Sequence, residues 1–546
     1  MDILTRIIEK RLADIESLGL DFGLSLPEAR KRPLHTFLKT KGVILEVKRA
    51  SPSKGDISPK LDAYQTALSY ARSGAAAISC LTENNFFKGS LSDLVNVCRA
   101  IDDYTSDDYD SSGTVPAVLR KDFLLFPEEV EISYKAGADA VLLIARILPK
   151  ETLLKMAEEV ARFGMSALIE IRSEEDLKKL AYVFGHKDFM AIATSNGSCD
   201  NFVCGVNSRD LATFKIDLLR PCMMFQKILK IMGDNARIIF ESGVTNYECA
   251  AAVSSMDFTG LLLGEAAAKN PELRKGLVDS FVSAKATRNA EFWKKYAESY
   301  YVELVSAPQQ IQKQAFFKIC GLTRIEDALE AERLGAKFLG FIFADAFSRS
   351  ITRDNRLEKL RPELDKLQAK KIAVIVDLDS PESKIAVQLV KDGGFDALQF
   401  HKIQYEKVDK SLLELPHYFV AGNLDDYEAL VSKGEMRVLL DSKEIVLGKA
   451  VSSTKIDTSN IVDSVNKSTK LSSKSDIKTT YEIKWIAGGI TPENVSDVIN
   501  HFSPELIDVS GGVETDDSIG IKDVNKMRQL ASYINYQCNN DNRSTK

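Results

Sequence analysis

Charged residues interrupt an apolar run near the start of the chain. In residues 43–49, Glu46 and Lys48 are two positions apart, so in an extended strand their side chains lie on the same face. The apolar residues next to them occupy the opposite face. Burying a carboxylate and an ammonium group is costly unless the two are paired, solvated or used in a reaction. Glu46 and Lys48 are therefore the first candidates for chemistry.

Further polar residues stand at the ends of other apolar runs in the first half of the chain. They are Lys121, Glu170, Asn207, Glu241 and Ser242. A lysine among carboxylates is suited to donating a proton, because desolvation and neighbouring charge tune its pKa in opposite directions. The alternative interpretation of each residue is a stabilising ion-pair network that takes part in no reaction.

The elements that must position these residues are short apolar runs that alternate with segments of helical periodicity, a pattern that predicts βα units and a parallel sheet. In the first half the predicted strands are 43–49, 76–81, 117–123, 138–145, 166–171, 202–207, 236–242 and 260–265. In the second half they are 316–321, 338–343, 371–376, 396–401, 417–422, 437–441, 484–489 and 506–511. Eight such strands close into a (β/α)8 barrel of about 250 residues, whereas an open doubly wound sheet has fewer strands. The chain therefore predicts an α/β fold of two consecutive TIM barrels joined by a short helical linker.

The boundary between the two barrels is expected where the composition turns polar. We expect a first barrel with an extra N-terminal helix at residues 1–285, a linker at 286–314 and a second barrel at 315–546. Residues 290–304 have the character of a terminal helix of the first barrel, and a polar connector follows them.

Small residues that could hold a phosphate group accompany the polar strand ends. Ser51 follows the first predicted strand, Gly243 follows the seventh, and Gly264 and Glu265 end the eighth. Glycine lets backbone N–H groups approach an anion, and a helix N-terminus adds about half a positive charge. Active sites of TIM barrels lie at the carboxyl ends of the strands, with phosphate held after strands seven and eight. The polar residues are thus expected to converge on one rim.

The composition excludes several classes of function. A net charge of −6 disfavours nonspecific nucleic-acid binding, and no apolar run is long enough to span a bilayer. The N-terminal residues form an amphipathic pattern that differs from a signal peptide. The eight cysteines are scattered without a CxxC pair, which predicts a reducing compartment, the cytosol. We expect a monomer without metal or cofactor that acts on phosphorylated small molecules.

The motifs of the first half resemble those of indole-3-glycerol-phosphate synthase. They are EVKRASPSKGDI, FFKGSLSDL, VLRKDF, LIEI, CGVNSRDLATFKID, IIFESGV and LLLGEA, and they extend over roughly residues 1–270. This resemblance implies conversion of 1-(2-carboxyphenylamino)-1-deoxyribulose 5-phosphate to indole-3-glycerol phosphate, with release of CO₂ and water and with no metal or organic cofactor.

The resemblance also implies a role for each polar residue. Lys121 is the general acid on the substrate ketone, Lys48 binds the carboxylate, and Glu170 is the acid and base of dehydration. The residues expected to orient these groups are Glu46, Asn207, Glu241 and Arg209. The residues expected to hold the phosphate are Ser51, Gly243, Gly264 and Glu265, and Ser242 is a further residue expected to bind the substrate.

The second half begins with Lys318 and Cys320 on one face of a strand. A lone cysteine at such a position is more often a core residue. The motifs KICGLT, IAGGITPENV and IDVSGGVETDDSIGIKD, however, resemble phosphoribosylanthranilate isomerase. That family performs an Amadori rearrangement, which yields the ketone that the first barrel would consume.

This second resemblance implies that Cys320 is the general base, as a thiolate, and that Asp441 is the general acid. These roles require a raised pKa for Asp441 and a lowered pKa for Cys320, for which Lys318 is the candidate cause. Arg349 is expected to hold the anthranilate end, with Asp508 assisting. The expected phosphate seat consists of Gly488, Gly489, Ser510 and Gly511.

The second half departs from that family's pattern at three places. Residues 452–457 read SSTKID where the family has a glycine-rich run, within a Ser-, Thr- and Lys-rich segment 452–480 that predicts a mobile loop. The loop around Arg349 reads FSRS, and residues 400–402 read Phe-His-Lys instead of Leu-His-Gly.

Three interpretations stay open. The chain is a bifunctional enzyme, or a synthase joined to a catalytically silent barrel that acts as a scaffold, or another phosphosugar barrel pair such as the histidine-pathway isomerases. The last usually carry paired aspartates at opposing strand ends, where this chain has Glu46 with Lys48 and Lys318 with Cys320. A pure binding module would have little reason to keep such residues in apolar strands.

Overall fold

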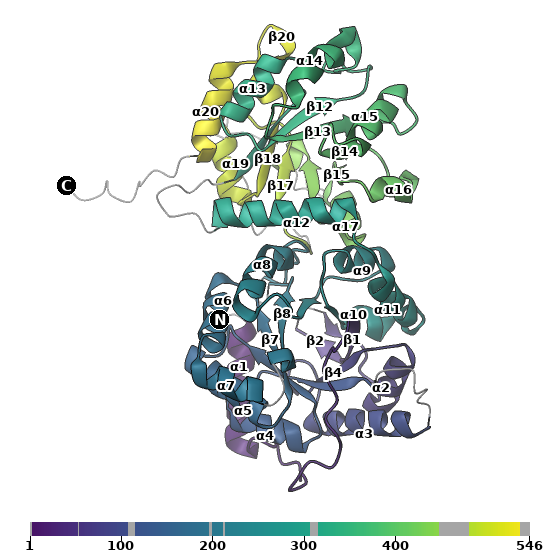
Figure 1. Ribbon diagram of the computed structural model, residues 1–546, viewed down its shortest axis with the longest axis vertical. Helices are drawn as coiled ribbons and strands as arrows, with labels where there is room; N and C mark the ends of the chain where they lie inside the picture. The colour runs from purple at the N-terminus through teal and green to yellow at the C-terminus, as the bar shows by residue number, and fades with distance from the viewer. Residues whose placement is uncertain are drawn as a thin grey trace, which may run out of the picture. The chain divides into compact units, whose positions relative to one another are not determined.

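The computed structural model describes residues 3–52, 54–107, 115–195, 199–210, 213–305, 315–446 and 480–535. The chain divides into two compact units, Met1–Ala286 and Thr287–Lys546. Each unit contains one closed barrel of eight parallel strands (Figure 1). The predicted fold class of two TIM barrels is therefore confirmed. The segment 452–479 lies outside the described residues.

The first barrel contains all eight predicted strands in sequence order. They are β1 (Gly42–Val47), β4 (Ala77–Leu81), β5 (Ala117–Lys121), β6 (Ala140–Ile144), β7 (Ser166–Ile171), β8 (Phe202–Asn207), β9 (Ile238–Glu241) and β10 (Gly260–Leu263). β1 pairs with both β4 and β10, which closes the barrel. Ile44, Leu168 and Ile239 belong to the buried cluster that fills the interior. Because the strands are parallel, their carboxyl ends form one rim, which carries the polar side chains at the ends of β5, β7, β8 and β9.

Helices surround these strands. They are α2 (Ala63–Arg72), α3 (Leu91–Asp107), α4 (Glu128–Lys135), α5 (Lys150–Arg162), α6 (Glu174–Phe184), α7 (Lys187–Ser195), α8 (Arg220–Met232), α9 (Tyr247–Ser254), α10 (Glu265–Lys269) and α11 (Arg274–Ser283). Capping side chains fix several starts, as where Ser173 accepts a hydrogen bond from the backbone N–H of Asp176 at α6.

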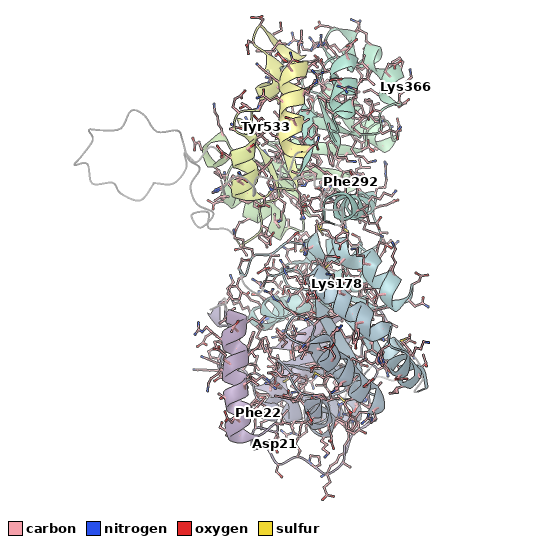
Figure 2. The ribbon with its side chains drawn as sticks, turned by 90° about the vertical axis from the view of Figure 1, so that its left-hand side faces the viewer. Asp21, Phe22, Lys178, Phe292, Lys366 and Tyr533 are labelled. Carbon is pink, nitrogen blue, oxygen red and sulfur yellow. The ribbon has the colours of Figure 1, made fainter. Side chains whose placement is uncertain are left out.

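The extra N-terminal helix α1 (Ile3–Leu18) packs on the rim where the strands end. Its residues Leu4 and Ile7 are buried in the same cluster as Phe123, which follows β5. Phe22 lies just beyond the end of this helix (Figure 2). The helix is therefore in reach of the loops that carry the polar strand ends.

The second barrel repeats the arrangement, again with all eight predicted strands. They are β11 (Phe316–Cys320), β12 (Phe338–Ile342), β13 (Lys370–Ile375), β14 (Ala397–His401), β15 (His417–Ala421), β16 (Val438–Asp441), β17 (Trp485–Ala487) and β18 (Leu506–Val509). The main surrounding helices are α13 (Ile325–Arg333), α14 (Arg356–Leu364), α15 (Pro381–Lys391), α17 (Leu424–Ser432), α19 (Val495–Phe502) and α20 (Val524–Asn535). A hairpin of β19 (Glu514–Thr515) and β20 (Ser518–Lys522) follows β18.

The helix α12 (Arg288–Tyr300) differs from the sequence-based expectation. We expected it to end the first barrel, but it belongs to the second compact unit. Trp293 and Tyr296 both pack against Trp485 at ring-centroid distances of 5.3 Å, and Trp485 Nε1 donates a 2.9 Å hydrogen bond to the Tyr296 hydroxyl. Trp293 and Tyr296 lie about one helical turn apart and form an apolar stripe on α12. Aromatic residues at the amino ends of the second barrel's strands, such as Trp485, bury this stripe.

Candidate active sites

The first site is centred on Lys121, the last residue of β5. Its Nζ donates to Glu241 Oε2 at 3.1 Å and to Glu170 Oε2 at 3.4 Å. Asn207 Nδ2 donates to the other Glu170 oxygen at 3.3 Å. Strands β5, β7, β8 and β9 thus bring four of the predicted residues into one hydrogen-bonded cluster.

Glu46 and Lys48 form a second pair on the same rim, with Lys48 Nζ 3.1 Å from Glu46 Oε1. Lys48 also lies over the Phe87 ring, 5.4 Å from its centroid. A Cβ at Gly264 would stand 2.6 Å from Glu46 Oε1, so only glycine at this position leaves room for the carboxylate. Glu46 interacts electrostatically with Lys121, which joins the pair to the cluster.

Electrostatics set the protonation of this cluster. Burial by itself lowers the pKa of Lys121, but the surrounding carboxylates outweigh burial and raise that pKa above lysine's ordinary value. Burial raises the pKa of Glu241 to about 8, against the opposing effect of Lys121. Among the described residues, Glu241 Oε1 and Glu46 Oε2 are buried and accept no hydrogen bond. The site therefore holds a protonated lysine beside acidic groups, of which Glu241 retains its proton up to a higher pH than an ordinary glutamate.

Sequence reasoning missed Gly205, in the middle of β8. A Cβ at this position would stand 2.0 Å from Glu241 Oε1. The available signal was its spacing, because Gly205 is two residues before Asn207 and shares its strand face. A strand glycine often marks such a close approach.

The residues expected to hold phosphate lie on the loops of the same rim. Ser242 and Gly243 follow β9 with positive φ angles of 71° and 87°. Gly264 is the N-cap of α10, whose first residue, Glu265, pairs with Lys269 at 2.7 Å. Ser51 is buried, at 8% exposure, in the short strand β2 (Ala50–Ser51) that follows β1.

Arg209 connects two of these loops. Its backbone N–H donates to Asn207 Oδ1 at 2.9 Å, and its guanidinium donates to the Phe214 carbonyl at 3.1 Å. Arg209 also contributes to a lowered pKa of Glu265: burial raises that pKa, but Lys269 chiefly, with Arg209 and Lys54, outweighs it. The loops after β8 and β10 are thus electrostatically coupled.

The second site is centred on Lys318 of β11, whose side chain has 0% exposure. Its Nζ donates to Asp508 Oδ2 at 2.7 Å and to Gln399 Oε1 at 2.5 Å, and lies 3.5 Å from Cys320 Sγ. The Tyr418 hydroxyl also donates to Gln399 Oε1, at 2.8 Å. Sequence reasoning missed Gln399, although a glutamine inside the apolar strand 396–401 was the available signal.

The pKa values in the second site agree with one expectation and contradict another. Burial and the neighbouring Asp508 raise the pKa of Asp441, which is the direction predicted for a proton donor. Burial also raises the pKa of Cys320, and the opposing effects of Lys318 and Lys522 do not cancel it. The expectation of a lowered cysteine pKa was therefore wrong, because the thiol is more deeply buried than its sequence position indicated.

Arg349 is fixed by a carboxylate that sequence reasoning did not single out. Its Nε and Nη2 donate to the two oxygens of Glu514 at 2.7 and 2.6 Å. A Cβ at Gly511 would stand 3.6 Å from Arg349 Nη2, and Ser510 Oγ donates to the Cys320 carbonyl at 3.1 Å. The structure thus brings Arg349, Ser510 and Gly511 together beside Cys320.

The remaining phosphate candidates are backbone positions. Gly488 and Gly489 follow β17 with φ angles of 110° and 68°.

His401 ends β14, and burial lowers its pKa, so the imidazole is biased toward its neutral form. His401 and Asp441 interact electrostatically, which places the ends of β14 and β16 on the same rim.

Two other properties concern only the described ranges. No helix within them is both long and apolar enough to cross a membrane. In that same part of the chain, no three His, Cys, Asp or Glu side chains are grouped as metal ligands would be.

Two barrels of parallel strands, each with a lysine and acidic side chains at the carboxyl ends of its strands, define the class of (β/α)8-barrel enzymes. The chain belongs to the indole-3-glycerol phosphate synthase family, whose family model matches residues 4–279. The family model of N-(5'-phosphoribosyl)anthranilate isomerase matches residues 317–532. Both resemblances inferred from the motifs are confirmed.

Relatives with both parts exist. The multifunctional tryptophan biosynthesis protein of Phycomyces blakesleeanus is 27% identical over 98% of this chain and 70% of its own length. That of Schizosaccharomyces pombe is 27% identical over 97% of this chain and 66% of its own length. An indole-3-glycerol phosphate synthase of Geobacillus kaustophilus is 31% identical over 51% of this chain and 96% of its own. The chain thus spans about two thirds of the multifunctional relatives' length.

Proposed function

We propose that this chain catalyses two consecutive steps of tryptophan biosynthesis. The second barrel isomerises N-(5-phosphoribosyl)anthranilate to 1-(2-carboxyphenylamino)-1-deoxyribulose 5-phosphate. The first barrel closes this ketone to indole-3-glycerol phosphate, with loss of CO₂ and water. The observation that carries the proposal is the tandem match of the two families in one chain, each over a closed eight-stranded barrel.

In the first barrel, Lys121 is the proposed general acid. Its raised pKa keeps it protonated at neutral pH, and its position between Glu170 and Glu241 fixes Nζ. A fixed ammonium can protonate the substrate ketone as the ring carbon attacks it. Lys48 would bind the carboxylate that leaves as CO₂, and its pairing with Glu46 orients it.

The dehydration that follows needs a group that takes one proton and delivers another. Glu170 is the proposed group, because Lys121 and Asn207 hold its two oxygens in place. Glu241, with its raised pKa, would share its proton with Lys121. Arg209 would brace the loop after β8, and the phosphate would lie against Ser51, Ser242, Gly243 and the backbone at Gly264 and Glu265.

In the second barrel, Asp441 is the proposed acid and Cys320 the proposed base. Asp441 has a raised pKa and can open the ribosylamine ring by protonating its oxygen. Cys320 is then a thiol at rest, and Lys318 at 3.5 Å favours the thiolate that removes the sugar proton. Arg349 would bind the anthranilate carboxylate and Asp508 would orient Lys318, with the phosphate at Gly488, Gly489, Ser510 and Gly511.

We also propose that the protein acts as a monomer in the cytosol. The six cysteines that the structure describes as free, from Cys80 to Cys320, are all buried, which fits a reducing compartment.

The test is to give the purified full-length chain phosphoribosylanthranilate and to measure indole-3-glycerol phosphate. Formation of the product supports both activities. Unconsumed substrate would instead indicate a silent second barrel, and direct addition of the carboxyphenylamino-deoxyribulose phosphate then tests the first barrel alone.

A further inference from the structure

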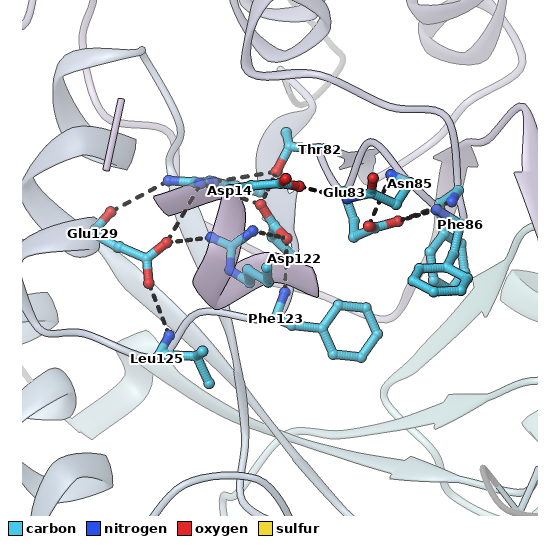
Figure 3. A network of polar contacts seen from close by, with 12 residues as sticks. Asp14, Thr82, Glu83, Asn85, Phe86, Asp122, Phe123, Leu125 and Glu129 are labelled. Atoms are coloured by element: carbon cyan, nitrogen blue, oxygen red, sulfur yellow. Dashed lines mark hydrogen bonds and ion pairs between the residues drawn. The ribbon is translucent and has the colours of Figure 1, made fainter. Parts of the chain in front are cut away.

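Arg11, on the extra helix α1, is buried at 2% exposure although it carries a charge. Its Nη1 donates to Asp122 Oδ1 at 2.6 Å, and its Nη2 donates to Glu129. Figure 3 shows these two acceptors, Asp122 and Glu129, within the network of polar contacts around them. Both carboxylates have 0% exposure. Arg11 thus connects helix α1 by hydrogen bonds to the carboxyl end of β5, which follows it by 111 positions.

The two carboxylates hold the chain on either side of the loop after β5. Asp122 directly follows Lys121 and accepts the backbone N–H of Phe123 at 2.8 Å. Glu129 accepts the backbone N–H groups of Leu125 and Phe126 at 2.8 and 3.2 Å. Arg11 bridges the two acceptors, so it closes a clamp around the loop that begins at Lys121.

Asp122 also accepts hydrogen bonds from side chains other than Arg11. Its Oδ2 accepts Thr82 Oγ1 at 2.5 Å and Arg120 Nη2 at 3.2 Å. Burial raises the pKa of Asp122, but Arg11, Arg120 and these hydrogen bonds outweigh it and lower that pKa. Arg11 and Arg120 both lie beside the two buried carboxylates Asp122 and Glu129. Loss of Arg11 would therefore leave two buried anions with one cation, which is costly and should loosen this part of the chain.

We propose that Arg11 is a positioning residue for the synthase reaction, which acts through Asp122 to hold the end of β5 and thereby the Nζ of Lys121 in its place between Glu170 and Glu241. The inference rests on the proposed role of Lys121. A displacement of a catalytic group by about 1 Å can cost about a hundredfold in rate, so loosening this clamp is expected to lower kcat rather than substrate affinity.

The chain offers a matched control. Arg30 has a side-chain exposure of 3% and donates to Asp139 Oδ1 at 2.6 Å, and Asp139 has 0% exposure. Asp139 directly precedes β6, at the opposite end of the barrel from the rim. Arg30→Met therefore breaks a buried arginine–aspartate pair of the same kind, also made by the N-terminal segment, without touching the end of β5.

The experiment compares Arg11→Met, Arg11→Lys and Arg30→Met in the full-length chain, with carboxyphenylamino-deoxyribulose phosphate as substrate. For Arg11→Met we expect kcat to fall about 10- to 100-fold with KM changed by less than about threefold, and Arg11→Lys to recover part of kcat. Arg30→Met should lower the thermal midpoint comparably while kcat stays within about twofold.

Equal kcat values for Arg11→Met and Arg30→Met, or a loss confined to KM, would overturn the inference. If Arg11→Met does not fold, Asp122→Asn replaces it, and a wild-type kcat in that variant has the same meaning. An inactive wild-type chain would instead refute the proposed function itself, so the two failures are distinguishable.

Discussion

Each barrel has a lysine among its inward-facing strand residues, Lys121 in the first and Lys318 in the second, but the two differ in side-chain exposure and in the groups that they contact. Lys121 retains 14% side-chain exposure and lies among carboxylates, whereas Lys318 has 0% exposure and contacts one carboxylate, one amide and one thiol. The pKa of each lysine is raised, because the anions outweigh burial. The difference in exposure fits the different roles proposed for them, because a substrate can reach only the lysine that is partly exposed.

In the second barrel the proposed acid and base are instead residues near the lysine. Cys320 has 7% exposure, and Asp441 is partly exposed. Lys318 pairs with Asp508 at 2.7 Å and lies 3.5 Å from Cys320 Sγ, so its proposed role is to favour the thiolate. Under the proposed mechanism, the first barrel would use its lysine as the acid, and the second would use its lysine to support another base.

The largest expected effect follows from removing the ammonium group of Lys121. Lys121→Met should lower the synthase kcat about 10²- to 10⁴-fold, the usual contribution of a general acid, and leave the isomerase unchanged. Both activities are measured separately on the same preparation. Synthase activity within tenfold of wild type would show that Lys121 is not the acid and would remove the contrast between the lysines.

The corresponding change in the second barrel is Cys320→Ser. A hydroxyl is a far weaker base than a thiolate, so the isomerase kcat should fall about 10²- to 10³-fold while the synthase is retained. Because burial raises the pKa of Cys320, the wild-type isomerase rate should increase with pH above neutrality, as the thiolate fraction grows. A pH–rate profile that is the same in the wild type and in the variant would contradict the assignment of Cys320.

A smaller effect is expected from filling the space beside Glu241. Gly205→Ala places a methyl group where the Glu241 carboxylate lies and should lower the synthase kcat about 10- to 100-fold. Gly260→Ala is the matched control, because its Cβ would contact Leu38 and Ile239 at 2.8 and 2.9 Å, away from the rim. It should lower stability and leave kcat nearly unchanged. Equal losses of kcat in both variants would argue against a specific role for Gly205.

The smallest effect concerns stability. Because burial raises the folded-state pKa of Glu241 to about 8, the folded chain holds a proton that the unfolded chain releases at lower pH. The stability contributed by this proton is complete below the unfolded pKa and is lost as the pH rises through the folded pKa. Glu241→Gln should therefore flatten the decline of the first barrel's thermal midpoint from pH 5 to 8, by about 2–4 °C. Parallel curves for both proteins would mean that Glu241 is charged throughout.

The sequence by itself determined the sixteen strands and most of the polar residues at their carboxyl ends, but it did not single out Gly205 or Gln399. Strand and helix periodicities are local signals, so the runs 166–171 and 202–207 coincide with β7 and β8. The same locality explains why Glu46 with Lys48, and Lys318 with Cys320, were recognised as pairs on one face.

Only the tertiary structure decided which distant residues meet. Gln399 reaches Lys318 because closure of the barrel aligns their strands, and Arg11 reaches Asp122 because α1 folds over the rim. The assignment of α12 to the second barrel follows from the aromatic base that covers Trp293. The raised pKa of Cys320 depends on burial, which is the sum of all packing around it. Such contacts and burial are set by the whole fold, and no local pattern in the sequence encodes them.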